Sequence, residues 1–160
     1  MVTVADLVAE SDQEHGEALE KTGYWGKRAA GAIFFSQKTQ RFGLGLRSQG
    51  VLEPGTLGSV GGAIDGDEDV EEAIKREIDE ETGLASGFTL KPIFIFKDGN
   101  FSYHNYVAIV PDEFEPQLNW ENDDIIWLTL DEMQEHDGLH YGMHNVLGDA
   151  KAMSILSSLQ

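Results

Sequence analysis

The sequence contains no cysteine and few basic residues, and each shortage excludes a class of function. Without cysteine the chain forms no disulfide and no thiolate site, which suits a cytoplasmic protein. Only 11 Lys and Arg stand against 29 Asp and Glu, for a formal net charge of −18. A chain this acidic lacks the basic surface that neutralises phosphate groups. We therefore expect no binding to duplex DNA or to an anionic membrane.

Long apolar runs and linkers are also missing. No stretch approaches the roughly 20 apolar residues that cross a bilayer, and the N-terminus lacks the basic segment and apolar core of a secretory signal. The 160 residues contain four prolines and no low-complexity run. We therefore expect a single domain over residues 1–160, with an N-terminal helical extension over residues 1–22.

The most informative segment is an acidic helix predicted to end near Thr82. Glu77, Glu80 and Glu81 stand at i, i+3 and i+4, so their carboxylates share a face. With Glu77 at zero on a helical wheel, Glu81 falls at about 40° and Glu80 at about 300°, while an apolar stripe that includes Ile78 spans about 20–100°. Carboxylates beside a buried stripe need a partner, because burying an unpaired charge is costly. Hard oxygen ligands point to Mg²⁺ or a similar ion rather than to zinc.

Other motif-based interpretations of the polar residues fail. Asp65, Asp67 and Asp69 alternate like the start of an EF-hand loop, but the glycine and the terminal glutamate of that loop are absent. No Gly-x-x-x-x-Gly-Lys-Ser/Thr segment occurs, which excludes a P-loop. His140 and His144 are four residues apart without an HExxH zinc motif, so we expect surface or cap histidines.

The spacing of the acidic segment resembles that of a known family. Every specified position of the Nudix hydrolase box is matched, without a gap, by Gly62-x5-Glu68-x7-Arg76-Glu77-Ile78-x-Glu80-Glu81-x-Gly83-Leu84. The segment Glu53-Pro54-Gly55-Thr56 resembles the turn that usually precedes the box. Leu57 and Val60 replace the Trp and Pro that the family often shows there, a departure that bears on the shape of the substrate pocket. The resemblance implies an α+β fold, a Nudix-type α/β/α sandwich with a mixed sheet.

The resemblance also implies a metal site. Glu77, Glu80 and Glu81 are expected to hold Mg²⁺, for which Mn²⁺ is a substitute. A main-chain carbonyl at Gly61 or Gly62 is expected to add a ligand, since these glycines let the backbone come close to the ion.

Two further box residues are expected to support the metal site rather than bind the ion. In the family resemblance Arg76 pairs with a box glutamate and fixes its orientation. Glu68 lies near the positive N-terminus of the helix, where a carboxylate is favoured, and Asp67 or Glu68 is the expected helix cap.

One acidic residue outside the box is a candidate for the general base. Glu121 precedes the predicted last strand, a region from which Nudix enzymes commonly bring an acid to the metals or the attacking water. Asp123 and Asp124 compete with it, and Glu77 and Glu80 are the alternatives within the box.

Periodicity and turn signals predict the remaining elements. An amphipathic helix is expected over residues 4–21 and a short helix over residues 131–136. A longer helix is expected over residues 143–159. The expected strands and extended segments cover residues 27–36, 42–46, 56–64, 88–97, 101–110 and 124–130. Asp98-Gly99-Asn100 is a hairpin turn signal.

These features predict a metal-dependent pyrophosphohydrolase that cleaves a nucleoside diphosphate linked to another group. The alternatives are a Nudix-fold nucleotide-binding or sensor module without hydrolysis, and an acidic metal-binding or interaction protein without an active site. The expected partner is a small-molecule nucleotide, with a homodimer as an option. Six aromatic residues are candidates to stack on a base, although each also suits a core: Tyr24, Trp25, Phe101, Tyr103, Trp120 and Tyr141.

Overall fold

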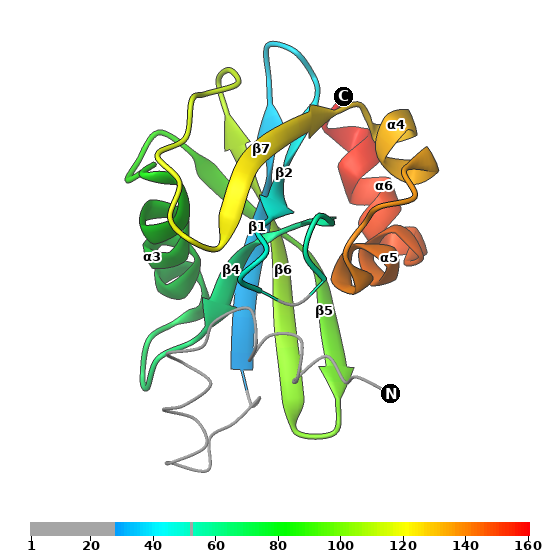
Figure 1. Cartoon of the computed structure of the whole chain (residues 1–160). Coiled ribbons are helices and arrows are strands. Elements are labelled where there is room, and N and C mark those ends of the chain that lie inside the picture. The colour runs from blue at the N-terminus through cyan, green and yellow to red at the C-terminus, as the bar shows by residue number, and fades with distance from the viewer. Residues whose placement is uncertain (1–27, 52) are drawn as a thin grey trace.

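Strand β1 (Arg28–Ser36) lies at the centre of a mixed seven-stranded sheet in the computed structural model, which describes residues 28–51 and 53–160 (Figure 1). The helix expected over residues 4–21 lies outside the described residues. One edge of β1 pairs with β2 (Phe42–Arg47) and β4 (Val60–Ala63), both antiparallel. The other edge pairs in parallel with β6 (Phe101–Val110).

The remaining strands extend this sheet on both sides. β5 (Thr89–Asp98) pairs with β6 as an antiparallel hairpin. β3 (Leu57–Gly58) and β7 (Asn122–Leu128) both pair antiparallel with β2. The strands predicted from the sequence are thus present, with bounds shifted by up to two residues, and the segment expected to be extended over residues 56–64 divides into β3 and β4.

Helices cover both faces of the sheet because β1 is apolar on both faces. Ala30, Ala32 and Phe34 pack with helix α3 (Val70–Thr82), whereas Ile33 and Phe35 pack in the second core. The second core includes residues of α4 (Leu130–Glu135), α5 (Tyr141–Leu147) and α6 (Ala150–Ser158). Figure 1 shows α3 on one side of the sheet and α4 to α6 on the other. The expected α/β/α sandwich with a mixed sheet is confirmed.

Helix α3 is capped at both ends by residues suited to the task. Asp69 is the N-cap, with an extended backbone and a side chain that accepts from the backbone N–H of Glu72 at 2.9 Å. The expected cap at Asp67 or Glu68 is therefore wrong by one or two residues, because the Glu68 carboxylate bonds elsewhere. Gly83 ends the helix as expected, at φ 78°, a conformation that favours glycine.

The long C-terminal helix predicted over residues 143–159 is wrong, because the structure has two helices there. α5 ends at Leu147 with Gly148 as its C-cap, and Asp149 then caps α6 by accepting from the backbone N–H of Ala152 at 2.9 Å. The Gly-Asp pair is a stop signal followed by a start signal. The short helix α4 begins one residue earlier than expected, after a capping box formed by Thr129 and Glu132.

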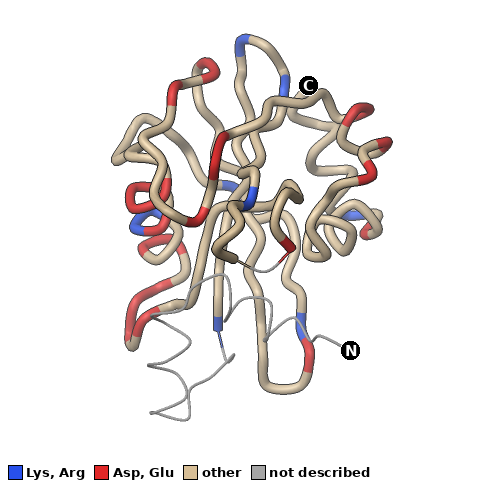
Figure 2. The backbone as a smooth tube through the Cα atoms, viewed as in Figure 1, with Lys and Arg blue, Asp and Glu red and all other residues tan. Residues whose placement is uncertain are grey.

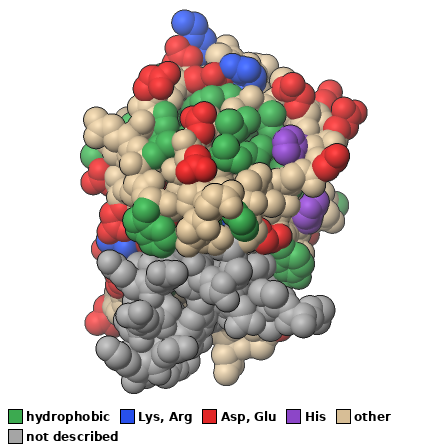
Figure 3. All heavy atoms as spheres, viewed as in Figure 1, with side chains coloured by type: hydrophobic (Ala, Val, Ile, Leu, Met, Phe, Trp, Pro, Cys, Tyr) green, Lys and Arg blue, Asp and Glu red, His purple; other side chains and the backbone are tan. Residues whose placement is uncertain are grey.

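Acidic residues outnumber basic ones in the described part of the chain. Figure 2 shows that Asp and Glu recur along α3 and the loop before it, while Lys and Arg are sparse. On the face in Figure 3, acidic side chains stand among apolar ones with few basic neighbours. Within the described residues no helix is both long and apolar enough to span a membrane.

His140 is a buried cap that holds α5 against the rest of the fold. Its Nδ1 accepts from the backbone N–H of Gly142 at 3.0 Å, and its Nε2 lies 3.2 Å from Glu53 Oε2. Burial lowers the pKa of His140 to about 3, with smaller contributions from the positive charges of Arg47 and His144. The ring is therefore neutral at pH 7, so its contact with Glu53 is not an ion pair. The cap role expected for this histidine is confirmed.

A buried neutral histidine makes stability depend on pH. The unfolded chain protonates this residue below about pH 6.5, whereas the folded chain does so only near pH 3. The free energy of unfolding should thus fall as pH drops through that window. His140→Asn keeps a good capping side chain without the titration, so its melting temperature should fall less than that of the wild type on acidification from pH 7 to pH 5. His144→Asn, at an exposed histidine of the same helix, is the control. An equal fall in melting temperature for His140→Asn and wild type between pH 7 and pH 5 would contradict this role.

Candidate active site

The C-terminal half of α3 carries two buried carboxylates. Glu77 and Glu81 are 1% and 2% exposed, and they lie on the helical face that also buries Ile74 and Ile78. Their burial follows from spacing, because residues four apart lie one above the other on a helix. The wheel therefore places these two glutamates correctly.

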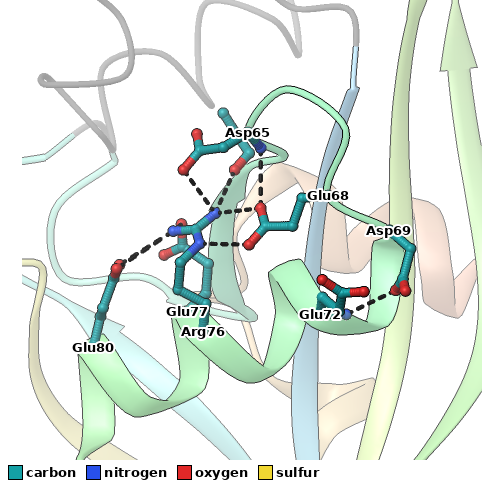
Figure 4. Close-up of polar contacts among 8 residues, drawn as sticks. Asp65, Glu68, Asp69, Glu72, Arg76, Glu77 and Glu80 are labelled. Atoms are coloured by element: carbon teal, nitrogen blue, oxygen red, sulfur yellow. Dashed lines mark hydrogen bonds and ion pairs between the residues drawn. The ribbon is translucent and has the colours of Figure 1, made fainter.

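Glu80 lies apart from the other two box glutamates. Its side chain is 53% exposed, and both carboxylate oxygens lie 3.4 Å from Arg76 Nη1 (Figure 4). At that length the contact is weak. The three box glutamates thus share a broad face, but only Glu77 and Glu81 are buried.

Arg76 joins the box glutamates to the loop before α3. It makes a two-pronged contact with Glu68, from Nε at 2.9 Å and from Nη2 at 3.0 Å (Figure 4). Nη1 donates to Glu77 Oε1 at 3.0 Å, and Nη2 donates to the Ala63 carbonyl at 3.1 Å. The hydrogen bonds to Glu68 and the nearby carboxylates raise the pKa of Arg76. These contacts are those expected of a residue that orients Glu77.

Glu68 completes the link between the loop and α3. While its carboxylate binds Arg76, its Oε1 also accepts from the backbone N–H of Asp65 at 3.0 Å. Asp65 Oδ2 lies 3.4 Å from Arg76 Nη2. Glu68 therefore ties the loop to α3, and this use of its carboxylate explains why Asp69 caps the helix instead.

Glu81 contacts the opposite side of the site. Its Oε1 accepts from Asn122 Nδ2 at 2.9 Å, and its Oε2 is buried without a donor among the described residues. Burial raises the pKa of Glu81 well above its usual range, and the negative charges of Glu121 and Glu77 raise it further. Such a crowded carboxylate is stabilised by a proton or by a cation.

Glu121 immediately precedes β7 and is 8% exposed, so its side chain is buried although it belongs to the turn before the strand. Its backbone N–H donates to Asn119 Oδ1 at 3.0 Å, and its carbonyl accepts from the N–H of Ser48 at 3.0 Å. It lines a pocket together with Glu81, whereas Asp123 and Asp124 are exposed and do not line it. The geometry thus favours Glu121 over its two competitors.

Gly61 and Gly62 lie in β4, where they line the same pocket. Gly61 pairs with Gly31 of β1, and a Cβ on Gly61 would lie only 2.2 Å from the Ala30 carbonyl oxygen. Only glycine allows the two backbones to approach this closely, and the approach brings the main chain of β4 beside Glu81.

The pocket also contains groups that the sequence did not reveal. They include one cationic side chain, Arg47, and several amides contributed by different elements. The lining residues are Arg47, Ser59, Gly61, Gly62, Glu81, Phe96, Tyr103, Asn105, Glu121, Asn122, His140, Tyr141, Gly142, Met143 and Asn145. No sequence motif joins Arg47, Asn105, Asn122 and Asn145, because the packing of three strands and helix α5 brings them together.

Two of the six aromatic candidates line this pocket. Tyr103 forms a hydroxyl–hydroxyl hydrogen bond with Ser59 at 2.9 Å, and Tyr141 is 43% exposed. Phe101 is buried in a small core, and Trp120 is exposed and does not line the pocket. Tyr24 and Trp25 lie outside the described residues.

The donors at this site fit a hard divalent cation. Carboxylate and main-chain carbonyl oxygens are ligands that Mg²⁺ prefers, and the buried Glu81 Oε2 has no donor within the described part of the chain. In the described part of the chain no three His, Asp or Glu side chains already converge as a metal cage. Glu77 and Glu80 instead contact the guanidinium of Arg76.

Comparisons with solved structures agree with the fold. A MutT Nudix hydrolase from Burkholderia pseudomallei is 26% identical, with 78% of this chain and 97% of that chain covered and a TM-score of 0.58. An Ap4A hydrolase from C. elegans is 20% identical, with coverages of 82% and 98% and a TM-score of 0.61. The NUDIX domain of Shewanella oneidensis NrtR, solved with ADP ribose, is 18% identical, with coverages of 91% and 98% and a TM-score of 0.65.

Sequence comparisons give the family. A search of curated proteins gives no match. The family model for the NUDIX domain matches residues 26–147, which include the whole box and Glu121. That match spans most of the chain and agrees with the sandwich fold and the position of α3. The chain belongs to the Nudix hydrolase family.

Proposed function

We propose that the protein is a metal-dependent pyrophosphohydrolase that cleaves a nucleoside diphosphate linked to another group. The observation that carries the proposal is the burial of Glu77 and Glu81 within a complete Nudix box, where Glu81 Oε2 has no donor among the residues that the structure describes. Buried like charges are stable only when something positive lies among them. A divalent cation meets that need and also binds the diphosphate of a substrate.

The proposed metal ligands come from α3 and β4. Glu77, Glu80 and Glu81 would hold Mg²⁺ or Mn²⁺ with a carbonyl of Gly61 or Gly62. When bound, the ion supplies charge neutralisation at the diphosphate and lowers the pKa of a bound water.

The chain's own residues supply orientation and proton transfer. Arg76 orients the Glu77 carboxylate through a 3.0 Å hydrogen bond from Nη1 to Oε1. Glu121, buried beside Glu81 in the pocket, would take the proton from the attacking water. This proton leaves the water as its oxygen attacks phosphorus and the bridging P–O bond breaks.

The pocket suits a small nucleotide. Arg47, the one basic residue among the lining residues, offers charge for a phosphate, and Tyr141 offers an exposed ring at the same pocket. Ap4A and ADP-ribose appear in the names of structures with the same fold. These two compounds therefore belong first in a substrate panel, followed by oxidised nucleoside triphosphates, NADH and capped RNA.

The binding-module alternative is less favoured because none of the box glutamates is missing, and Glu77 and Glu81 are buried as ligands would be. A panel assay that measures release of phosphate or pyrophosphate in Mg²⁺ buffer separates the two functions. Binding without release would support the module. The cytoplasmic location and the homodimer stay predictions.

Metal removal gives the first test of the mechanism. EDTA should abolish turnover, and added Mg²⁺ or Mn²⁺ should restore it, because the proposed reaction requires a divalent cation bound by Glu77 and Glu81. Metal should also raise the melting temperature, since a ligand present at 100 times its dissociation constant adds about 2.7 kcal/mol of stability. Undiminished turnover in metal-free buffer would end the assignment.

Charge removal on α3 separates ligands from scaffold. Glu81→Gln and Glu80→Gln keep the side-chain shape but lose a charge, so each should lower kcat by orders of magnitude. Glu81→Gln should also raise the melting temperature in EDTA at pH 7, because burial and its neighbours disfavour the charged form of Glu81. Asp79→Asn, on the exposed face of the helix, is the matched control. Equal losses of activity at Asp79 and Glu81 would refute the division of the helix into two faces.

The role of Glu121 is tested by its own amide variant. A general base contributes about 10²–10⁴-fold to rate, so Glu121→Gln should lower kcat by at least about tenfold, measured at saturating substrate and metal. Its Mn²⁺ dissociation constant should change less than that of Glu81→Gln. Asp123→Asn, an exposed carboxylate two residues along the chain, controls for loss of charge. If Glu121→Gln turns over at the wild-type rate, the base is Glu77 or Glu80 instead.

A further inference from the structure

The hydrogen bond from Asn122 to Glu81 joins the last strand to the metal-binding helix. The two residues are 41 positions apart, their side chains meet at 2.9 Å, and they are 6% and 2% exposed. An amide nitrogen only donates, so it selects an acceptor oxygen on Glu81. Oε1 thus already accepts one hydrogen bond, whereas Oε2 accepts none from residues 28–51 and 53–160 and is the oxygen better placed to bind a cation.

An irregularity in β7 places Asn122 on the correct face of the sheet. Residues 122 and 125 of a regular strand point to opposite faces. Here Leu46 pairs with Asp124 while Arg47 pairs with Asn122, so one extra residue, Asp123, stands in β7. The extra residue moves Asn122 to the face of Ile125, which packs in the α3 core. Without this shift the amide would point away from Glu81.

Gly45 provides the space that the amide fills. It lies in β2 opposite Ile125, and a Cβ added to Gly45 would lie 2.5 Å from Asn122 Oδ1 and 3.0 Å from Cγ. Its φ is not positive, so the requirement for glycine here is steric rather than conformational. Any side chain at this position displaces the Asn122 amide.

We propose that Asn122 is a positioning residue that fixes the Glu81 carboxylate so that Oε2 faces the metal, with Gly45 holding the space for it. This inference rests on the proposed function, because it assumes that Glu81 is a ligand. Partners that orient a metal ligand typically contribute 10–100-fold to affinity. Two side-chain hydrogen bonds then join α3 to the sheet, from Arg76 to the Ala63 carbonyl of β4 and from Asn122 of β7 to Glu81.

The test measures metal binding without substrate. Mn²⁺ is titrated into EDTA-treated, dialysed full-length protein, and free Mn²⁺ is followed by electron paramagnetic resonance. Asn122→Leu removes the donor at similar volume and should weaken Mn²⁺ binding at least about tenfold. Gly45→Ala keeps the amide but moves it and should weaken binding in the same direction. If Asn122→Leu does not fold, Asn122→Ser replaces it, because the shorter side chain falls short of Glu81.

Two controls separate positioning from general stability. Asp123→Asn changes a neighbouring exposed residue of β7 and should leave the Mn²⁺ dissociation constant within twofold of wild type. The double variant Gly45→Ala/Asn122→Leu should bind no more weakly than Asn122→Leu alone, because both changes remove one interaction. Melting temperatures in EDTA are recorded for each variant.

The outcomes distinguish this inference from the function on which it rests. A wild-type protein that fails to bind Mn²⁺ overturns both. A wild-type protein that binds, with Asn122 variants that bind within twofold of it, overturns the positioning role alone, even if those variants melt at lower temperature. Weakened binding in both single variants with no further loss in the double variant is the expected result.

Discussion

The constraint on which this site depends is the burial of like charges at one end of α3. Glu77 and Glu81 are almost completely buried, one helical turn apart, with Glu121 close to Glu81. Arg76 offsets part of this charge, since it binds Glu77, but it lies on the side toward the loop before the helix. Glu81 receives a neutral amide instead. The charged form of Glu81 is therefore disfavoured by burial and by its acidic neighbours, and a bound cation would stabilise it.

The sheet topology creates this arrangement because two different strands pair with successive parts of the same edge of β1. The edge pairs with β4 along residues 29–32 and with β2 at residues 34–35, so two strands diverge from the same neighbour. β7 then adds to β2. The glycines of β4 and the first residues of β7 consequently reach the same pocket as Glu81, although the chain separates them by up to 61 residues. The close approach of Gly61 to β1 is part of that geometry rather than a local turn requirement.

Those parts of the fold and site that depend on local spacing were predictable from the sequence. The burial of Glu77 and Glu81 follows from helical periodicity, and the end of α3 at Gly83 follows from the conformational freedom of glycine. Predictions that depended on which of several similar residues acts were less accurate. The sequence offers three possible N-caps for α3, namely Asp67, Glu68 and Asp69. Glu68 is not the cap because its carboxylate binds Arg76. In the C-terminal region, apolar periodicity continued across two helices and concealed the break at Gly148.

Residues that depend on strand register were not predictable in this way. Asn122 lies beside Glu121 in an acidic stretch and carries no motif, and nothing local in the sequence identifies the extra residue in β7 that turns its side chain toward α3. Arg47, Asn105 and Asn145 likewise reach the pocket from β2, β6 and α5. The carboxylates proposed to hold the metal are thus concentrated in one helix, where spacing reveals them, whereas the residues that line the pocket are spread over the sheet and α5. Substitutions in β2, β6 and α5 can therefore alter which molecule fits the pocket while the carboxylates of α3 stay in place, which explains why the box identifies the family but not the substrate.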